Sequence, residues 1–330
     1  MNGAIAQLFL PRPRDATVAG ALTWTLVVAW TAWALVRVLG LETGWPLAAM
    51  LAFTPYVALT ALIPLGVALA LRRWAAAAIA ALVLVVLATL VLPRAFGGPT
   101  EAKGAAGPTL RALAANMRLG HGEPEALVEL VRELDVDVLC VEELTPKLGR
   151  ALDAAGLREL MPDRELRTGA SALGGGLYAR RGLLGRIHVR SLGEGFPLIS
   201  GELRIPGAAP VEALSVHTAP PVHGVSWESD IEALPGAVEA PLRVLLGDFN
   251  ATLDQEAFRD LLDRGYADVG STLGDGLTPT WPTNRIFPPL VTIDHVLADE
   301  RIGIDDYSVH DIPGSDHRAV FAELTLPAEP

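Results

Sequence analysis

The chain has little cysteine and little charge, and each shortage excludes a class of protein. Cys140 is the single cysteine, so an intramolecular disulfide and a cysteine-cluster zinc site are both excluded. Only 19% of the 330 residues are charged, whereas 51% are hydrophobic. This composition is too apolar for a wholly soluble protein. Part of the chain is therefore expected to lie in lipid.

The hydrophobic surplus is concentrated in the first 92 residues. Three segments there approach or exceed the roughly 20 residues that a helix needs to cross a bilayer. These segments are 17–39, 45–71 and 74–92. Three long segments joined by short loops do not fit a cleavable signal peptide. Pro55 and Pro64 leave a buried soluble helix open for the second segment, so two spans remain an alternative to three. We expect residues 1–93 to form a membrane domain with three transmembrane helices.

Basic residues near the ends of these segments predict the topology. Arg12 and Arg14 precede the first segment. Arg72 and Arg73 fill the second loop, whereas the first loop carries Glu42. Because basic loops tend to stay in the cytoplasm, three spans would place the rest of the chain outside it. The prediction is a multi-pass protein of the cell membrane with an extracytoplasmic domain.

Composition and charge change after the last hydrophobic segment. Residues 94–109 are rich in Gly, Pro and Ala and lack apolar periodicity, which predicts a flexible linker. Residues 110–330 are numerous enough to bury a sizeable core. The first 96 residues hold six basic and two acidic side chains, so the rest holds 20 basic and 36 acidic ones, a formal net charge of −16. Such a domain repels a polyphosphate backbone, and nucleic acid is therefore a less favoured substrate.

Strand-like and helix-like segments alternate in residues 110–330, as expected of an α/β or α+β domain. Strands are predicted at 109–116, 135–143, 174–182, 199–205, 211–219, 242–249, 291–299 and 318–326. Helices are predicted at 123–134, 225–234 and 254–265.

Polar side chains recur at the ends of these predicted strands. They are Asn116, Glu143, His217, Asp248, Asn250, Asp294, Asp316 and His317. Burying an ionised carboxylate is unfavourable without a cation or a hydrogen-bonded partner, so carboxylates at strand ends suggest a shared metal beside an open cleft. Taken singly, each residue also has a structural explanation, such as a turn for Asp248 and Asn250. The combination in this order favours a site.

The motifs that carry these residues resemble the endonuclease/exonuclease/phosphatase superfamily, the fold of type I deoxyribonuclease. They are LAANM, DVLCVEEL, SVHTAPP, LLGDFNATLD, TIDHVLAD and GSDHRAVFAEL, spread over about Leu110 to Leu326. The resemblance implies an α/β fold in which a two-sheet β-sandwich is flanked by helices. It places the site at one edge of the sheets and implies a metal-dependent hydrolase of phosphate esters or anhydrides.

The same resemblance implies roles for individual residues. Asn116, Glu143 and Asp316 would bind metal, and their oxygens suit Mg²⁺ or Mn²⁺. His217 would contact the scissile phosphate, Asp248 would orient or deprotonate the attacking water, and Asn250 would bond a phosphate oxygen. Asp294 would hold His317, which completes the set. Glu142 stands where the family commonly has Gln, and the sequence leaves open whether it raises the pKa of a neighbour or faces solvent.

A narrower resemblance concerns the substrate. Three spans before an outer domain with TPTWP ahead of IDHVL resemble the bacterial membrane family linked to teicoplanin resistance. The activity proposed for that family is removal of phosphate from undecaprenyl pyrophosphate, which implies the bilayer and a phosphorylated lipid as partners. Trp227, Trp281, Arg285 and Phe287 could contact a prenyl chain or headgroup, with core packing at least as open for the tryptophans. No protein partner is predicted. The alternatives are a membrane-tethered extracytoplasmic nuclease and a catalytically inactive binding module.

Overall fold

The computed structural model describes residues 13–104, 106–222, 227–237, 241–286 and 290–329. Two compact units divide the chain between them. The first consists of Met1–Glu42 and Phe53–Leu92, and the second of Thr43–Ala52 and Pro93–Pro330. Arg12, Phe287 and the first two residues of the helix predicted at 225–234 lie outside the described residues.

The first unit is helical. Its helices are α1 (Pro13–Leu39), α3 (Thr54–Thr60), α4 (Leu62–Ala70) and α5 (Trp74–Val91). Within the described residues, two helical stretches are long and apolar enough to cross a membrane, namely Val18–Leu39 and Trp74–Ala95.

The prediction of three transmembrane helices is wrong at the second segment, because residues 45–71 do not form one continuous helix. That segment is divided among α2 (Leu47–Leu51), α3 and α4, and its longest apolar stretch, Thr54–Ala70, falls short of a span. Proline lacks a backbone N–H and is tolerated in the first turn of a helix rather than inside it. Pro55 and Pro64 accordingly lie near the starts of α3 and α4.

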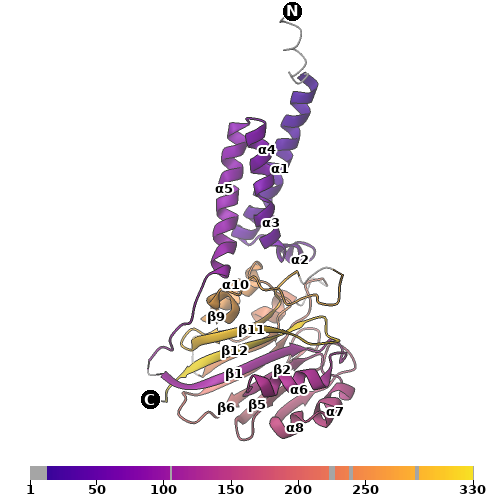
Figure 1. Ribbon diagram of the computed structural model, residues 1–330, viewed down its shortest axis with the longest axis vertical. Helices are drawn as coiled ribbons and strands as arrows, with labels where there is room; N and C mark the ends of the chain where they lie inside the picture. Colours follow the sequence, from indigo (N-terminus) through magenta and orange to yellow (C-terminus); the bar gives the residue numbers. More distant parts are fainter. Residues whose placement is uncertain (1–12, 105, 223–226, 238–240, 287–289, 330) are drawn as a thin grey trace, which may run out of the picture. The chain divides into compact units, whose positions relative to one another are not determined.

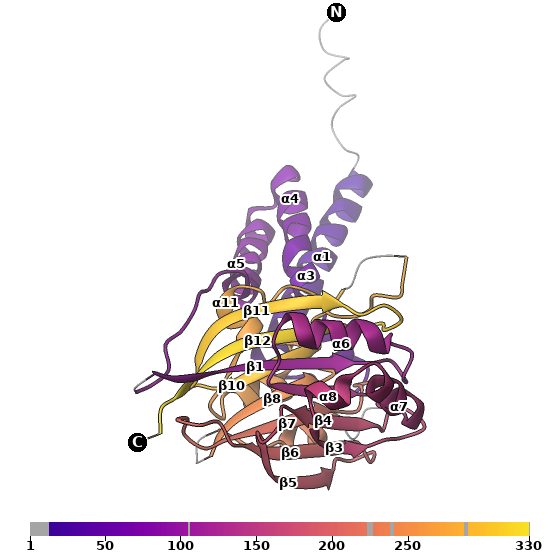
Figure 2. The same ribbon diagram turned by 60° about the horizontal axis from the view of Figure 1, so that its bottom comes forward.

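The second unit is built on two β-sheets. Within the described residues each sheet has six strands, in the orders β11-β12-β1-β2-β4-β3 and β5-β6-β7-β8-β10-β9 (Figures 1 and 2). The first sheet contains β1 (Ala106–Asn116), β2 (Val138–Glu142), β3 (Asp163–Arg167), β4 (Gly175–Ala179), β11 (Gly303–Asp311) and β12 (Arg318–Pro327). The second contains β5 (Leu184–Ser191), β6 (Pro197–Leu203), β7 (Val211–His217), β8 (Leu242–Asp248), β9 (Tyr266–Asp268) and β10 (Asp294–Asp299).

Alternation along the strands places apolar side chains on both faces of each sheet. In β8, Val244 and Leu246 join a cluster that contains residues of both sheets, and this cluster fills the space between them. Leu245 points to the opposite face and packs with residues of α9 (Trp227–Glu232) and α10 (Glu256–Leu262).

The outer face of the first sheet is covered in the same way. It packs against α6 (Pro124–Glu133) and α7 (Pro146–Ala154), with α6 beside β1 in Figure 2. The described part of this unit also contains three short helices, α2, α8 (Leu157–Leu160) and α11 (Val269–Leu273). The expected two-sheet α/β fold flanked by helices is confirmed.

The two sheets repeat one arrangement of strands. Each has a central parallel pair, β1 with β2 and β7 with β8. An antiparallel strand borders each pair on the β1 or β8 side, β12 in the first sheet and β10 in the second. The carboxyl ends of the four parallel strands and the starts of β10 and β12 therefore carry the polar motifs.

The segment predicted as a flexible linker, 94–109, packs against the second unit over much of its described length. Arg94 is buried and ion-paired with Asp254. Thr100 forms a bridge with Ile304, and β1 already begins at Ala106. This segment is held by an ion pair and by backbone hydrogen bonds, not by a stripe of apolar side chains. A search for apolar periodicity therefore does not detect its contacts.

Candidate active site

Strand register brings most of the predicted residues to one end of the sandwich. In the second sheet, His217 and Asp294 are both register partners of Asp248, from β7 and β10. In the first sheet, Asn116 of β1 is the partner of Glu142 of β2. Because each pair belongs to adjacent hydrogen-bonded strands, these side chains leave the sheets at nearly the same level.

The turn after β8 gives Asp248 its orientation. Gly247 has a φ of +139°, and a Cβ there would lie 2.0 Å from the carbonyl oxygen of Val216. Glycine is therefore required at this position. Asn250 lies in the left-handed region with a φ of +47°, and its backbone N–H donates to Asp248 Oδ1 at 2.8 Å. The GDFN motif thus bends sharply and holds the carboxylate in one position.

The two sheets are connected at the site through Asn116. Its Nδ2 donates to Asp248 Oδ2 at 3.0 Å and to Glu143 Oε1 at 3.4 Å. Ser315 Oγ donates to the Asn116 carbonyl at 2.6 Å and accepts from the His317 backbone N–H at 3.0 Å. Asn116 and His317 are therefore held by one serine that the sequence analysis did not single out, although it precedes Asp316 in the GSDH motif.

His317 and Asp294 form a buried pair. His317 Nδ1 lies 3.1 Å and 3.0 Å from the two carboxylate oxygens of Asp294, and 3.8 Å from Asp248 Oδ2. Burial alone would lower the pKa of His317, but the charges of Asp294 and Asp248 raise it to about 10. The imidazole is therefore protonated at neutral pH, as opposite charges at this distance favour.

Asp248 and His217 are shifted toward their neutral forms. Burial raises the pKa of Asp248 to about 7, with His317 opposing this shift and Asp294 adding to it. His217 Nε2 lies 3.7 Å from Asp248 Oδ2, and burial together with the charge of His317 lowers the His217 pKa to about 3. His217 also packs edge-on against Phe196, with ring centroids 4.7 Å apart. At neutral pH it is an uncharged hydrogen-bonding group.

Glu142 is buried beneath these residues. Its side chain is 1% exposed, and neither carboxylate oxygen has a hydrogen-bond partner in another described residue. Burial raises its pKa well above the usual value, and the charges of Asp294 and Asp248 raise it further. The alternative that Glu142 faces solvent is wrong. It belongs to a group of buried acids that includes Asp248 and Asp294.

A divalent metal fits the donor chemistry of this region. Among the described residues, Asp248, Asp294 and His317 offer atoms that all lie within 4.8 Å of one another, but protonated His317 has no lone pair for a cation, so the ligands in this group would be the carboxylate oxygens. Glu143 and Asp248 place carboxylate oxygens around Asn116 Nδ2. Asn116 Oδ1 accepts from the Arg118 N–H at 2.9 Å with a second lone pair left over. Such oxygens are hard donors suited to Mg²⁺ or Mn²⁺. Closely spaced buried carboxylates are otherwise unfavourable, so a cation would relieve their repulsion.

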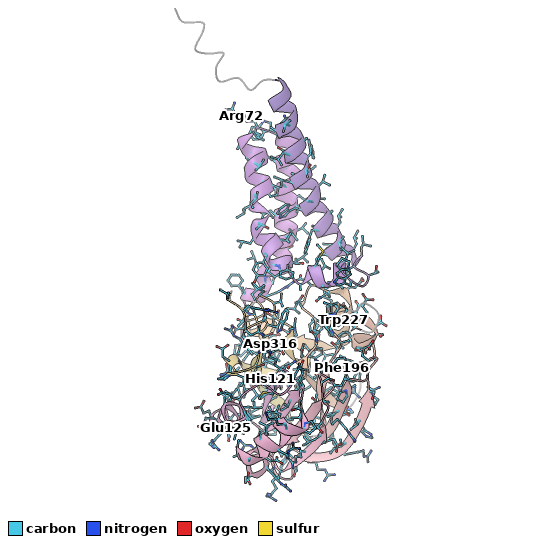
Figure 3. All side chains as sticks on the ribbon, turned by 90° about the vertical axis from the view of Figure 1, so that its right-hand side faces the viewer. Arg72, His121, Glu125, Phe196, Trp227 and Asp316 are labelled. Carbon is cyan, nitrogen blue, oxygen red and sulfur yellow. The ribbon has the colours of Figure 1, made fainter. Side chains whose placement is uncertain are left out.

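Asp316, the third predicted metal ligand, lies apart from the contacts of Asn116 and Glu143. Its Oδ2 lies 3.8 Å from Arg118 Nε and 3.3 Å from Asn284 Nδ2. Asp316 is labelled in Figure 3 together with His121, whose backbone packs against the Pro313–Gly314 turn. Its role in metal binding stays a prediction. Arg118 is a partner that the sequence analysis missed, because no spacing rule pairs it with a residue almost 200 positions away.

The remaining predicted residues surround this arrangement. Asn250 Nδ2 donates to the Thr218 carbonyl at 2.9 Å, which leaves its second amide hydrogen for a ligand. Trp281 is partly buried with its ring centroid 6.3 Å from that of His317, whereas Arg285 is exposed. Trp227 is buried and donates to the Phe249 carbonyl at 3.1 Å, so it supports the turn that carries Asn250 (Figure 3).

Comparisons with known proteins agree with this geometry. The Endonuclease/Exonuclease/phosphatase family profile matches residues 113–317. No curated protein matches the chain. Truncated TDP2 of Caenorhabditis elegans has a TM-score of 0.53 at 16% identity, covering 66% of this chain and 97% of its own.

Two further solved structures are similar to this chain. D. rerio TDP2 complexed with a single strand DNA product has a TM-score of 0.53 at 14% identity and covers 66% of this chain and 98% of its own. The endonuclease/exonuclease/phosphatase from Bacteroides vulgatus has a TM-score of 0.51 at 14% identity, covering 66% and 99%. These likenesses show the fold alone. Because the family profile spans more than half of the 330 residues, the chain belongs to the Endonuclease/Exonuclease/phosphatase family.

Proposed function

We propose that the protein is a membrane-anchored, divalent-metal-dependent phosphohydrolase. Its substrate would be a lipid-linked pyrophosphate such as undecaprenyl pyrophosphate, and its biological role would be in teicoplanin resistance. Family members are usually metal-dependent hydrolases of phosphate esters or phosphodiesters. The observation that carries the proposal is the His317–Asp294 pair beside Asp248, in a chain that also has two helices long and apolar enough to span a membrane.

Asp248 would position the attacking water and accept its proton. Its carboxylate is fixed by the Asn250 N–H and the Asn116 amide. A general base works best when its pKa lies near the working pH, and burial brings the pKa of Asp248 to about 7. The water oxygen would bond to phosphorus while the bond from phosphorus to the leaving oxygen breaks.

The other site residues would stabilise the negative charge that develops on phosphoryl oxygens. His317 is held in its protonated form by Asp294 and can donate through Nε2 to the leaving or an equatorial oxygen. His217 and the second amide hydrogen of Asn250 can donate to the same group. A divalent ion held by Asn116 and Glu143, with Asp316 as a further candidate, would neutralise phosphoryl oxygens when bound.

The anchor is the argument for a lipid substrate. Attachment to a membrane raises the effective concentration of headgroups at a tethered site. The net charge of −16 on residues 97–330 disfavours long polyanions. A single pyrophosphate on a lipid presents far less negative charge and is a better match.

The test is hydrolysis by the full-length chain in detergent, with and without Mg²⁺. The panel is undecaprenyl pyrophosphate, phosphatidate, sphingomyelin and plasmid DNA, assayed by released phosphate, phosphocholine or nicked plasmid. We expect Mg²⁺-dependent phosphate release from the pyrophosphate, lost in His317→Ala. His310→Ala is the control, because His310 is half-buried in β11 and bonds to Ser308, outside the site. Equal rates for the two variants would contradict the proposal.

A nuclease is the second candidate, supported by the structural likeness to D. rerio TDP2 complexed with single strand DNA product. Plasmid nicking in the same panel without phosphate release from any lipid would favour it. No Mg²⁺-dependent turnover of any member would favour a catalytically inactive binding module.

A further inference from the structure

The segments that flank the apolar helices belong to the catalytic unit. Residues 43–52 lie in the chain between α1 and α3, yet they cluster with Pro93–Pro330. The Gly44 N–H donates to Glu228 Oε1 at 2.9 Å. Ala48 is 1% exposed and joins the apolar cluster of Trp227 and Phe258. This loop is therefore built into the packing of the second sheet.

The segment after α5 is attached to the same unit by a buried ion pair. Arg94 Nη1 and Nη2 donate to the two carboxylate oxygens of Asp254 at 2.8 Å and 2.6 Å. The side chains are 8% and 0% exposed. The Arg94 carbonyl also accepts from the Gly276 N–H at 3.1 Å. A bidentate pair of this kind fixes direction as well as distance.

Each of the two segments also makes a contact with the loop that follows Asp248. Asp254 pairs with Arg94, and the next residue, Gln255, donates through Nε2 to the Ala48 carbonyl at 2.9 Å. Gln255 Oε1 in turn accepts from the backbone N–H of Thr252 at 2.6 Å and from its hydroxyl at 3.0 Å. Two consecutive residues thus connect the end of this loop to two segments that are about 40 residues apart in the chain.

The other end of the loop lies beside the proposed catalytic residues Asp248 and Asn250. Asn250 follows Asp248 by two residues and has a φ of +47°, a left-handed conformation that is uncommon for residues other than glycine, although asparagine adopts it more readily than most. Displacement by about 1 Å is enough to reduce catalysis strongly. A loop with one end at Asp248 and the other at Gln255 needs both ends fixed to keep Asn250 in place.

We propose that residues 43–52 and 93–98, the anchor-flanking segments, position the catalytic loop 249–255. Arg94 and Gln255 are positioning residues that act through this loop on Asp248 and Asn250. The inference rests on the proposed function, since it assigns these residues to the same site. It makes the active site dependent on the segments that enter and leave the helical unit.

The test uses the full-length chain in lipid nanodiscs with Mg²⁺, with two readouts. One is kcat and KM for 4-nitrophenyl phosphate and bis(4-nitrophenyl) phosphate, and the other is amide hydrogen exchange of residues 249–255. Arg94→Met is expected to lower kcat at least tenfold, to change KM less than threefold, and to speed exchange in the loop at least tenfold. Arg94→Lys keeps the charge and is expected to recover part of kcat.

Arg301→Met is the matched control. Arg301 pairs with Asp299, which is 2% exposed and lies at the end of β10 opposite to Asp294. Its loss should lower thermal stability as Arg94→Met does, yet leave kcat within twofold and loop exchange unchanged. Equal kcat in the two variants at a temperature where both are folded, or unchanged loop exchange in Arg94→Met, would overturn the inference.

Gln255→Met provides an independent second variant. It keeps the length of the side chain but removes both the donor to Ala48 and the acceptor for Thr252, and it is expected to lower kcat threefold to tenfold. No effect on kcat or exchange would count against the inference. Absence of Mg²⁺-dependent turnover of every substrate in the lipid and DNA panel above would instead overturn the proposed function, and the exchange comparison would then decide the inference alone.

Discussion

Replacing Asp294 with Asn should move the alkaline limit of activity. Asn has nearly the same shape, but it removes the charge that lies 3.0 Å from His317 Nδ1. That charge is the main reason why the pKa of His317 is raised to about 10. Without it, the pKa should fall to about the ordinary value of 6.5 or below, because burial lowers it and only Asp248 still raises it.

The size of the effect follows from protonation. At pH 8, a group with a pKa of 10 is about 99% protonated, whereas one with a pKa of 6.5 is about 3% protonated. Under the proposed roles protonated His317 is the active form, so activity should fall as the pH rises through its pKa. Asp248 still raises this pKa in part, so we expect kcat/KM at pH 8 to fall about tenfold or more. An imidazole turned by the new amide would add to the loss.

The assay is kcat/KM for a soluble phosphate ester from pH 6 to 10.5 at saturating Mg²⁺, which reports ionisations of the free enzyme. The parent should lose activity near pH 10 and Asp294→Asn at or below about pH 6.5. Thermal melting of both proteins serves as the control for folding. An alkaline limb at the same pH in both would refute the assignment of His317 as the protonated group.

Further predictions concern the base, the buried acid, the metal and the core. Asp248→Asn should lower kcat at least about a hundredfold while melting stays cooperative, because a positioned base is lost; a tenfold change would be too small. Glu142→Gln should raise the melting temperature more at pH 8 than at pH 5. The raised pKa of Glu142 favours the protonated folded state, so the parent is most stable below the ordinary pKa of the acid and loses stability as pH rises through the folded value; equal gains at both pH values would count against this. Chelation by EDTA should abolish hydrolysis, and added Mn²⁺ should restore it. Metal at about 100 times its Kd should add about 2.7 kcal/mol to the free energy of unfolding. A melting temperature that does not change with metal would argue against a bound ion. Phe258→Ala should destabilise the catalytic unit by about 3–5 kcal/mol in denaturant titrations, because Phe258 is fully buried between Phe249 and His295; less than 1 kcal/mol would mean that the site repacks.

The strands that the sequence predicts are those inside the sheets. All eight predicted strands occur, as β1, β2, β4, β6, β7, β8, β10 and β12. The four that it does not predict, β3, β5, β9 and β11, are the edges of the two sheets. An edge strand has a neighbouring strand on only one side and is more exposed than a central strand, so its sequence need not be a continuous apolar run. β3 reads DRELR and β5 leaves most of its residues partly or fully exposed, so neither shows a burial pattern.

The candidate site could be predicted as a set of strand-end motifs, but its packing could not. Alternation along β2 assigns a face to Glu142 and Glu143 only while the chain stays extended, and Glu143 has a φ of +55°. Which acid is buried therefore depends on a local turn. Residues 45–52 were assigned to a membrane span because hydropathy does not distinguish lipid from a protein surface as the partner of an apolar segment. The same limit applies to Arg94, whose partner Asp254 lies 160 residues away.

The repeated arrangement of strands means that the catalytic contacts also register one sheet on the other. Asn116 and Asp248 end equivalent strands, β1 and β8, and are 3.0 Å apart. Asp294 begins β10, His317 immediately precedes the equivalent strand β12, and the two side chains are also 3.0 Å apart. A slip of the sheets by one residue, about 3.3 Å, would break both pairs together. The geometry of the candidate site therefore depends on the alignment of the two sheets. A substitution that shifts one sheet relative to the other should lower activity even when it lies far from the site.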